Sequence, residues 1–286
     1  AHATHEEAWG MVSWAIEMYA KVYRELFALP GYVGRKSESE KFAGADVTLT
    51  YESLMPEGKA LQSCTAHDLG QNFSKAFDIK FQSSEGAPKY VWQTSWGLST
   101  RSIGGLIMAH GDDNGLRLPP RLAPIQVIVL PIKIEGEILR VSQVIAKNLK
   151  EAGIRAKIDD SDNETLGSRI NKWELKGVPL RMEIGPKEVQ AQTVTVVRRD
   201  TGEKLNFNVN DSVEKINDLL VQMQKNLYEE AEKFLNTNTR DIESYHEFKK
   251  TLSEDRGFLS AFWCEDEQCE KKIKEVIDFK TGEYSP

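Results

Sequence analysis

Two cysteines near the end of the chain, Cys264 and Cys269, have a spacing that could serve a metal, but they are the weakest of the candidate motifs. A structural zinc ion takes four ligands, and no Cys or His follows Cys269. The pair therefore predicts at most half of a zinc site. Other familiar motifs are missing from the sequence: there is no Gly-rich phosphate loop, no H-E-x-x-H and no G-x-S-x-G. What remains is a polar, Gly-rich stretch around Gly97, where a strand is expected to lead into a helix.

The composition is that of a water-soluble protein. The 286 residues carry 37 Lys+Arg and 44 Asp+Glu, a net charge of −7, which argues against a wholly basic nucleic-acid coat protein. The longest apolar run, residues 125–132, is far shorter than the roughly 20 residues that a membrane span needs. Three cysteines exclude a disulfide scaffold and indicate a reducing, cytoplasmic compartment, and no secretory leader is visible.

The first of three segments runs to residue 120. A Thr4-x-x-Glu7 capping box precedes a helical apolar pattern that should end before Pro30. Strand patterns follow at residues 47–54, 59–65, 78–82 and 89–95, with helices at about 69–77 and 99–109. Several strands close together in sequence favour an antiparallel sheet. Because the chain begins at Ala1, without Met and next to this helix, we expect it to be part of a longer polypeptide.

The second segment, residues 121–223, alternates strands and helices and predicts an α/β sheet. The strands are expected at 125–130, 154–159 and 178–184, with helices at about 136–151 and 164–175 and a closing hairpin around Asp200-Thr201-Gly202. The third segment opens with an amphipathic helix whose cap is predicted at Asp211.

Three stretches indicate a family. They are LQSCTAHDLGQNF at residues 61–73; TSWGLSTRSIG at 94–104, continued by HGD at 110–112 and LPPR at 118–121; and KWELKGVPLR at 172–181 with EIGPK at 183–187. Together they closely resemble prolyl-tRNA synthetase of the archaeal/eukaryote-like type, a class II aminoacyl-tRNA synthetase.

The resemblance implies the fold class and the domains. Residues 1–120 would form the C-terminal part of a class II antiparallel-sheet catalytic domain, and residues 121–223 an α/β anticodon-binding domain. Residues 224–286 would form a small C-terminal α/β, helical or zinc-domain-like segment that is incomplete. The family's dimer motif and its arginine-bearing strand pair would precede Ala1, so we expect the chain alone to be inactive in proline activation.

The implied reaction activates L-proline with ATP and Mg²⁺ to prolyl-adenylate and then transfers the prolyl group to tRNA(Pro). The residues expected to bind ATP are Phe42, Gln62, Thr65, Ser99 and Arg101. Arg101 would hold the γ-phosphate, because a guanidinium fork suits phosphate oxygens. Gln62 would also meet the magnesium ion through its amide oxygen. Phe42 would lie at the adenine edge.

Strand alternation creates a difficulty for this assignment. It places Gln62 and Cys64 on one face of their strand and Ser63 and Thr65 on the other. A bulge or the strand end must therefore bring Gln62 and Thr65 together, or one of the two assignments fails.

For proline, the resemblance implies that His67 lines the pocket and that Trp96 and Gly97 form its floor. For tRNA, the candidates are Lys172, Glu174, Arg181 and Lys187. Plainer interpretations remain open from the residues alone: a core histidine or tryptophan, a loop anchor for Phe42, a solvated Arg101, Ser99 as a simple helix cap, a salt-bridged face in the second segment, and Cys64 as a packed thiol.

The family often carries zinc at the position of Cys264 and Cys269, and the complete enzyme is expected to be a cytoplasmic homodimer. Two other hypotheses stay open. One is a non-catalytic tRNA-binding module with a remnant synthetase core, which the retained Gln62, Thr65, His67 and Arg101 argue against. The other is the same region of a larger fused synthetase.

Overall fold

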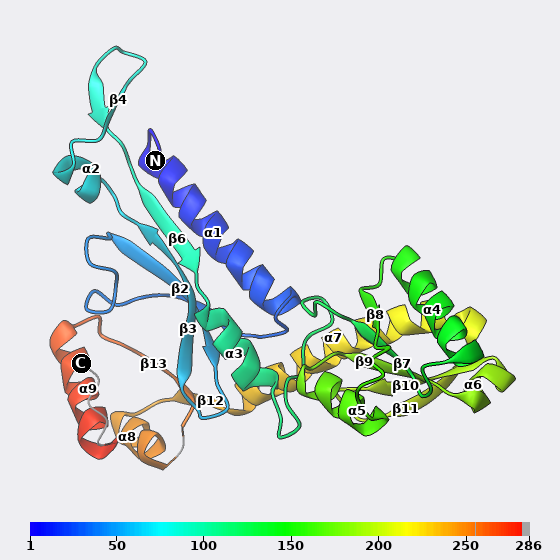
Figure 1. Cartoon of the computed structure of the whole chain (residues 1–286). Helices are drawn as coiled ribbons and strands as arrows, with labels where there is room; N and C mark the ends of the chain where they lie inside the picture. Colours follow the sequence, from blue (N-terminus) through cyan, green and yellow to red (C-terminus); the bar gives the residue numbers. More distant parts are fainter. Residues whose placement is uncertain (255, 282–286) are drawn as a thin grey trace. The chain divides into compact units, whose positions relative to one another are not determined.

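The computed structural model describes residues 1–254 and 256–281, which fall into two compact units (Figure 1). Unit 1 comprises residues 1–24, 30–105 and 232–286, and unit 2 comprises residues 25–29 and 106–231. The residues after 231 thus belong to the same compact unit as the first sheet. Within the described part of the chain, none of the helices has the length and apolarity of a membrane-spanning segment.

Unit 1 is built on an antiparallel four-stranded sheet in the order β1-β2-β3-β6. Its elements up to residue 105 are α1 (His5–Glu25), β1 (Tyr32–Arg35), β2 (Val47–Leu54), β3 (Ala60–Asp68), α2 (Asn72–Ala76), β4 (Lys80–Gln82), β5 (Pro88–Tyr90), β6 (Thr94–Leu98) and the start of α3 (Arg101–His110). The predicted capping box is confirmed, since the Glu7 N–H donates to Thr4 Oγ1 (3.2 Å) and the Thr4 N–H donates to Glu7 Oε2 (3.4 Å).

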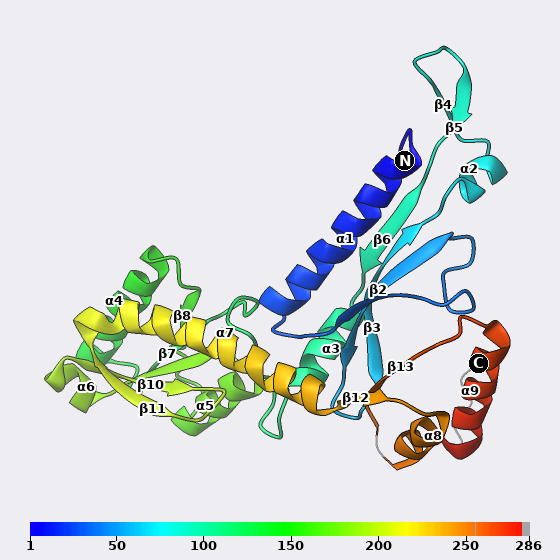
Figure 2. The same cartoon turned by 180° about the vertical axis from the view of Figure 1, so that it is seen from behind.

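Helix α1 lies along one face of this sheet (Figure 2). The ring of Tyr23 on α1 stacks on the ring of Tyr51 on β2, with the ring centroids 5.4 Å apart, and both residues are fully buried. The start of the helix is attached to the end of β3, because His5 Nε2 lies 2.6 Å from the buried carboxylate of Asp68. Helix α1 therefore covers the first face of the sheet, whereas the second face carries polar side chains, some of them buried, such as Thr48 and Thr50.

Two strand predictions need correction. Strand β1 was not anticipated, because its four residues are all exposed and show no alternation. The run at 89–95 is not one strand: β5 pairs with β4 in a separate hairpin, whereas β6 pairs with β3. The helix expected at 69–77 is shorter, since Gly70 takes a positive φ of 54° and α2 begins at Asn72.

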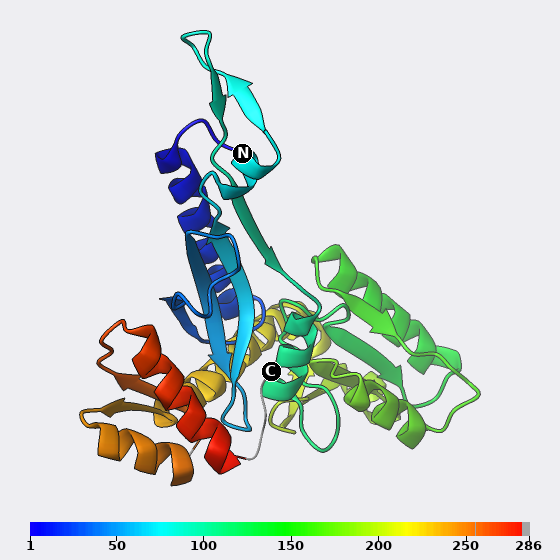
Figure 3. The same cartoon turned by 90° about the vertical axis from the view of Figure 1, so that its left-hand side faces the viewer.

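The rest of unit 1 is a small α/β group drawn in orange to red (Figure 3). It contains the end of α7, β12 (Thr239–Ile242), α8 (Tyr245–Glu254), β13 (Phe258–Ala261) and α9 (Glu267–Thr281). Strands β12 and β13 are parallel neighbours. The group adjoins β1, where the ring of Tyr32 meets that of Phe258 at 5.6 Å.

Unit 2 confirms the predicted alternation of strands and helices. Its elements are β7 (Val127–Pro131), α4 (Gly136–Glu151), β8 (Ala156–Ile158), α5 (Leu166–Leu175), β9 (Leu180–Ile184), α6 (Pro186–Ala191), β10 (Thr193–Arg198), β11 (Lys204–Asn208), a 3₁₀ turn (Val209–Asp211) and most of α7 (Ser212–Thr237). The sheet order is β11-β10-β9-β7-β8, with β8, β7 and β9 parallel and β10 and β11 antiparallel. The expected hairpin turn is present, with Gly202 at φ 72°. Asp211, the residue expected to cap the helix, is the last residue of the 3₁₀ turn, and α7 begins directly after it at Ser212.

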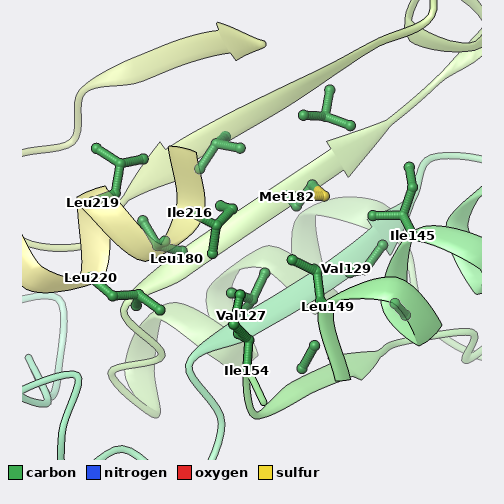
Figure 4. Packing of buried hydrophobic residues seen from close by; sticks show 14 of the residues in the cluster. Val127, Val129, Ile145, Leu149, Ile154, Leu180, Met182, Ile216, Leu219 and Leu220 are labelled. Carbon is green, nitrogen blue, oxygen red and sulfur yellow. The ribbon is translucent and has the colours of Figure 1, made fainter. Parts of the chain in front are cut away.

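Strand β7 in the sheet of unit 2 is buried on both faces, as its unbroken apolar run predicted. Val127 and Val129 face a core that includes Ile145 and Leu149 of α4 and Ile216 of α7 (Figure 4). On the other face, Ile128 and Leu130 pack against Trp173 of α5.

Replacing Leu149 by alanine should destabilise unit 2. Leu149 is fully buried, and a Leu→Ala change in a core costs about 2–5 kcal/mol through lost transfer energy and the cavity left behind. Hydrogen exchange at the β7 amides measures the loss in this unit alone. Val144 on the same helix is 56% exposed, so Val144→Ala is the matched control and should leave exchange nearly unchanged. Equal effects of the two substitutions would contradict the core described here.

Candidate functional site

A β-bulge in β3 determines which side chains of this strand lie on the face of the sheet opposite α1. Tyr51 of β2 pairs with Cys64, whereas the next residue, Glu52, pairs with Gln62, so Ser63 is one extra residue in β3. Ser63 and Cys64 are both buried, and alternation then resumes with Thr65 outward and Ala66 inward. Gln62, Thr65 and His67 consequently lie on the same face, which meets the condition that the sequence had set.

The bulge is held by the buried hydroxyl of Tyr23. This hydroxyl donates to the carbonyl oxygen of Ser63 at 2.8 Å, and it also makes a hydrogen bond with the hydroxyl of Ser102. Ser63 Oγ in turn donates to Ser53 Oγ at 3.2 Å. Burial raises the pKa of Tyr23, which keeps its proton in place. One side chain of α1 therefore fixes both the bulge and the first turn of α3, where Arg101 lies.

Residues of β6 complete this face. Gly97 pairs with Thr65, and Ser95 pairs with His67. After the strand, Ser99 Oγ accepts from the Arg101 N–H at 3.3 Å, so Ser99 acts as a cap of α3. The Arg101 guanidinium donates to the carbonyl oxygen of Gln62 at 3.4 Å and is otherwise exposed. The start of α3 thus lies beside the Gln62 end of the face.

The side chain of His67 has a defined neighbourhood. The hydroxyl of Thr48 accepts from the Phe42 N–H at 3.0 Å and lies 2.9 Å from Nδ1 of His67. The hydroxyl has two acceptor lone pairs and one proton, so it can satisfy Nδ1 of His67 in either neutral tautomer of the ring. Burial lowers the pKa of His67, so the ring is neutral near pH 7. The ring of Phe42 lies 5.0 Å from that of His67.

Trp96 does not join this group, which corrects the expectation that it forms a pocket floor. It pairs with the buried Ala66, and its ring meets those of Trp14 and Tyr19 on α1 at 6.1 Å each. Strand alternation sends Trp96 to the α1 side and exposes only Gly97 and Ser95 on the polar face.

The sequence reasoning missed four residues of the polar face: Thr48, Thr50, Glu52 and Ser95. Thr48 and Ser95 each pair with His67 from opposite sides. Thr50 pairs with Thr65, and Glu52 pairs with Gln62. Strand alternation could have placed Ser95 on the same face as Gly97. The three β2 residues could be placed only from the pairing register of β2 with β3. Cys64 is a packed thiol as anticipated, since burial raises its pKa to about 12.

In unit 2 the four predicted tRNA contacts do not form one cluster. Glu174 and Arg181 line the same small cavity beside Arg199, and Arg181 Nε lies 2.9 Å from Glu183. Lys172 instead pairs with Asp159 and Glu164, each at 3.0 Å. The pKa of the Asp159 carboxyl is lowered. Burial alone would raise this pKa, but hydrogen bonds from Trp173 and Lys172 lower it. Lys187 lies beyond the other end of β9, in the first turn of α6.

The two C-terminal cysteines lie close together in unit 1. A hydrogen bond with the thiol of Cys264 raises the pKa of Cys269, and both side chains are exposed. Across residues 1–254 and 256–281, His, Cys, Asp and Glu side chains nowhere gather in a group of three that suits a metal ion. Two thiols fall short of the four ligands of structural zinc, so the described residues do not fit a complete zinc site.

Comparison with known proteins identifies relatives over almost the whole chain. Residues 126–219 match the anticodon binding domain family. Proline–tRNA ligase 2 of Clostridioides difficile is 47% identical over 275 residues, and the proline–tRNA ligase of Prosthecochloris aestuarii is 49% identical over 279 residues. Each alignment covers 96% of this chain but only 57% of the relative's length.

Solved structures agree with this result. The prolyl-tRNA synthetase of Cryptosporidium parvum, crystallised with L-proline and AMP, superposes with a TM-score of 0.91 at 42% identity, covering 98% of this chain and 61% of that chain. The same enzyme with halofuginone and AMPPNP gives a TM-score of 0.92. These matches confirm the expected fold, a class II antiparallel core with an α/β anticodon-binding domain.

Replacing Tyr23 by phenylalanine should loosen β3. The ring and its stacking remain, but the buried Ser63 carbonyl loses its donor, which costs about 1–3 kcal/mol. Hydrogen exchange of the β3 amides measures the change. The control is Tyr90→Phe, whose exposed hydroxyl donates to Asp78 at 3.1 Å and should contribute little. A loss no larger than that of the control would mean that Tyr23 does not hold the bulge.

Proposed function

We propose that this chain, which is related to the proline–tRNA ligases along 96% of its length, carries part of the machinery that activates proline with ATP and attaches it to tRNA. The observation that carries the proposal is the polar face created by the bulge at Ser63, which gathers Gln62, Thr65 and His67 beside Arg101. Retention of this group favours the ligase over a non-catalytic tRNA-binding module. The chain spans about 57% of the length of these relatives, so the activity is proposed for the complete protein that carries it.

The first step joins the carboxylate of proline to the α-phosphate of ATP and releases pyrophosphate. Such a displacement needs correct positioning and neutralisation of phosphate charge, with no covalent intermediate on the enzyme. Arg101 is suited to hold the γ-phosphate, because its guanidinium is exposed and its backbone is fixed by the Ser99 cap. Thr65 and Gly97, which pair across the strands, would let the nucleotide lie against the middle of the face.

The oxygen atoms at one end of the face fit a magnesium ion. The Gln62 amide is exposed, and it pairs across the strands with Glu52, whose carboxylate also meets Lys36. Mg²⁺ is commonly held by one or two carboxylates together with substrate phosphates, so Gln62 and Glu52 would hold it with ATP. The ion would neutralise charge on the phosphates.

Proline would bind at the other end, near His67. A neutral imidazole can pack beside the pyrrolidine ring without adding charge. Ser95 and Gly97 would form the floor in place of Trp96, because they are the β6 residues on this face. Phe42 contacts the His67 ring, which would place it at the border between proline and adenine.

The second step transfers the prolyl group to tRNA, which unit 2 would bind. Its match to the anticodon binding domain family supports this role. Glu174 and Arg181 are the best candidates for reading base edges, because they line a common cavity at the surface of the sheet. Lys172 already pairs with two carboxylates, so it would bind tRNA more weakly. Lys187 would contact the backbone of the tRNA. A homodimer and a cytoplasmic location are proposed from the resemblance alone.

Replacing Arg101 by alanine should raise the KM for ATP about tenfold or more in ATP–pyrophosphate exchange by the complete protein. The reason is the loss of a charge-assisted phosphate contact worth about 1.5–3 kcal/mol. Lys89→Ala removes an exposed cation that pairs with Glu85 in the same unit, and serves as the control. An unchanged KM for ATP in Arg101→Ala would refute the phosphate role. If the wild-type protein binds tRNA but neither ATP nor proline, the non-catalytic module is the better account.

Replacing Arg181 by alanine should weaken tRNA charging while ATP–pyrophosphate exchange stays intact, because Arg181 lies in unit 2 and the adenylate site in unit 1. We expect the loss of about 1–3 kcal/mol of interaction energy to raise the KM for tRNA roughly five- to 150-fold. The matched control is Lys147→Ala, since Lys147 pairs with Glu151 on the exposed surface of α4. A parallel fall of exchange and charging would show that Arg181 supports the fold instead.

A further inference from the structure

The loop that carries Phe42 is held by the last described helix of the chain. This β1–β2 loop spans residues 36–46, and its two serines, Ser37 and Ser39, both donate to Glu270 Oε1 of α9, at 2.8 and 2.9 Å. One turn further along α9, Lys274 pairs with Glu40 of the same loop and lies 3.0 Å from Glu270. Two side chains of α9 thus bind three polar residues of the loop, Ser37, Ser39 and Glu40.

The charges at this contact are mutually satisfied. The Glu270 side chain is only 16% exposed. Its burial alone would raise its pKa, but hydrogen bonds from Lys274, Ser37 and Ser39 lower it. Burial likewise opposes the charge on Lys274, and hydrogen bonds with Glu40 and Glu270 raise its pKa. Both groups are therefore ionised across the neutral pH range, and the contact persists there.

The other side of the loop is attached to the first sheet. The Asn72 side chain donates to the Gly44 carbonyl oxygen at 3.0 Å and to the Asp46 carboxylate at 2.9 Å. The Phe42 N–H donates to Thr48, as described above. Phe42 lies between these two attachments, with its ring beside His67. Releasing the α9 side would leave residues 37–41 held mainly at their two ends, by the contacts of Lys36 with β2 and by the Phe42 N–H.

We propose that Glu270 and Lys274 are positioning residues that hold the β1–β2 loop, and with it Phe42, in place against His67. The effect on substrates rests on the proposed function, whereas the ordering of the loop does not. Helix α9 is then part of the support of the site, although Glu270 and Lys274 contact the loop and not the strands that carry the polar face.

Limited trypsin digestion tests the loop contact directly in the 286-residue chain. Lys41 immediately precedes Phe42, so mass spectrometry of the peptides cut after Lys41 measures how often this part of the loop opens. We expect Glu270→Ala to speed this cleavage about fivefold, as the loss of one charge-assisted contact of about 1 kcal/mol would. The loop-side variant Ser37→Ala/Ser39→Ala should do the same. The combination of all three substitutions should add little, because both variants remove the same contact.

The same helix offers a control. Lys271 pairs with Glu267 at 3.0 Å on its exposed surface, so Lys271→Met should leave cleavage after Lys41 unchanged. Lys274→Met provides a second test that keeps Glu270, and far-UV circular dichroism checks that each variant is folded. Cleavage that is unchanged in Glu270→Ala and Lys274→Met, or effects of the two sides that multiply, would overturn the proposal.

Exchange kinetics then separate the loop contact from the proposed activity. In the complete protein, Glu270→Ala should raise the KM for proline severalfold and leave kcat near that of wild type, whereas Lys271→Met should change neither. If the wild type shows no exchange, the proposed function fails while the cleavage result still stands. If exchange is normal and Glu270→Ala cleaves faster with unchanged KM values, α9 holds the loop but the loop does not position substrate, and the proposed effect on proline binding is wrong.

Discussion

A single extra residue in β3 determines the chemistry of the first unit. Without Ser63 as a bulge, strict alternation would bury Thr65 and His67 whenever Gln62 faced outward. A bulge leaves one backbone carbonyl without its partner in the strand ladder. Burying that carbonyl costs free energy unless another group donates a hydrogen bond to it. The hydroxyl of Tyr23 supplies that donor from within the α1 face of the sheet. The polar face therefore depends on a hydrogen bond made on the opposite, buried side.

The same hydroxyl links this strand to the helix that carries Arg101. Because Tyr23 also contacts Ser102, the end of the bulged strand and the start of α3 share one anchor. The guanidinium and the side chains of β3 are thereby fixed relative to each other by the core rather than by surface contacts. Preorganisation of this kind lets charged groups act on a phosphate without first reorganising.

Much of the fold was readable from hydrophobic periodicity. The strand at Val47–Leu54, the helix at Gly136–Glu151 and the parallel strands of unit 2 agree with the sequence patterns, because each buries a regular stripe. Strand β1 escaped, since four exposed residues become a strand only by pairing with β2. In the candidate site, the family resemblance singled out Gln62, His67 and Arg101, whose roles stay predictions, and only the register shows that Trp96 faces α1. The contact of Glu270 with Ser37 crosses 233 positions, and no local pattern announces it.

That separation has a consequence for how the protein is made. Local contacts such as the α1 cap form as soon as the neighbouring residues have been synthesised, and domains generally fold as synthesis proceeds from the N-terminus. Contacts between distant positions must wait, and they slow folding because a long loop of chain has to close. The loop around Phe42 emerges from the ribosome before α9, but some of its attachments lie on α9. A nascent chain can therefore complete its sheet well before this loop is secured, and the ribosome has to release α9 before the site acquires its final geometry.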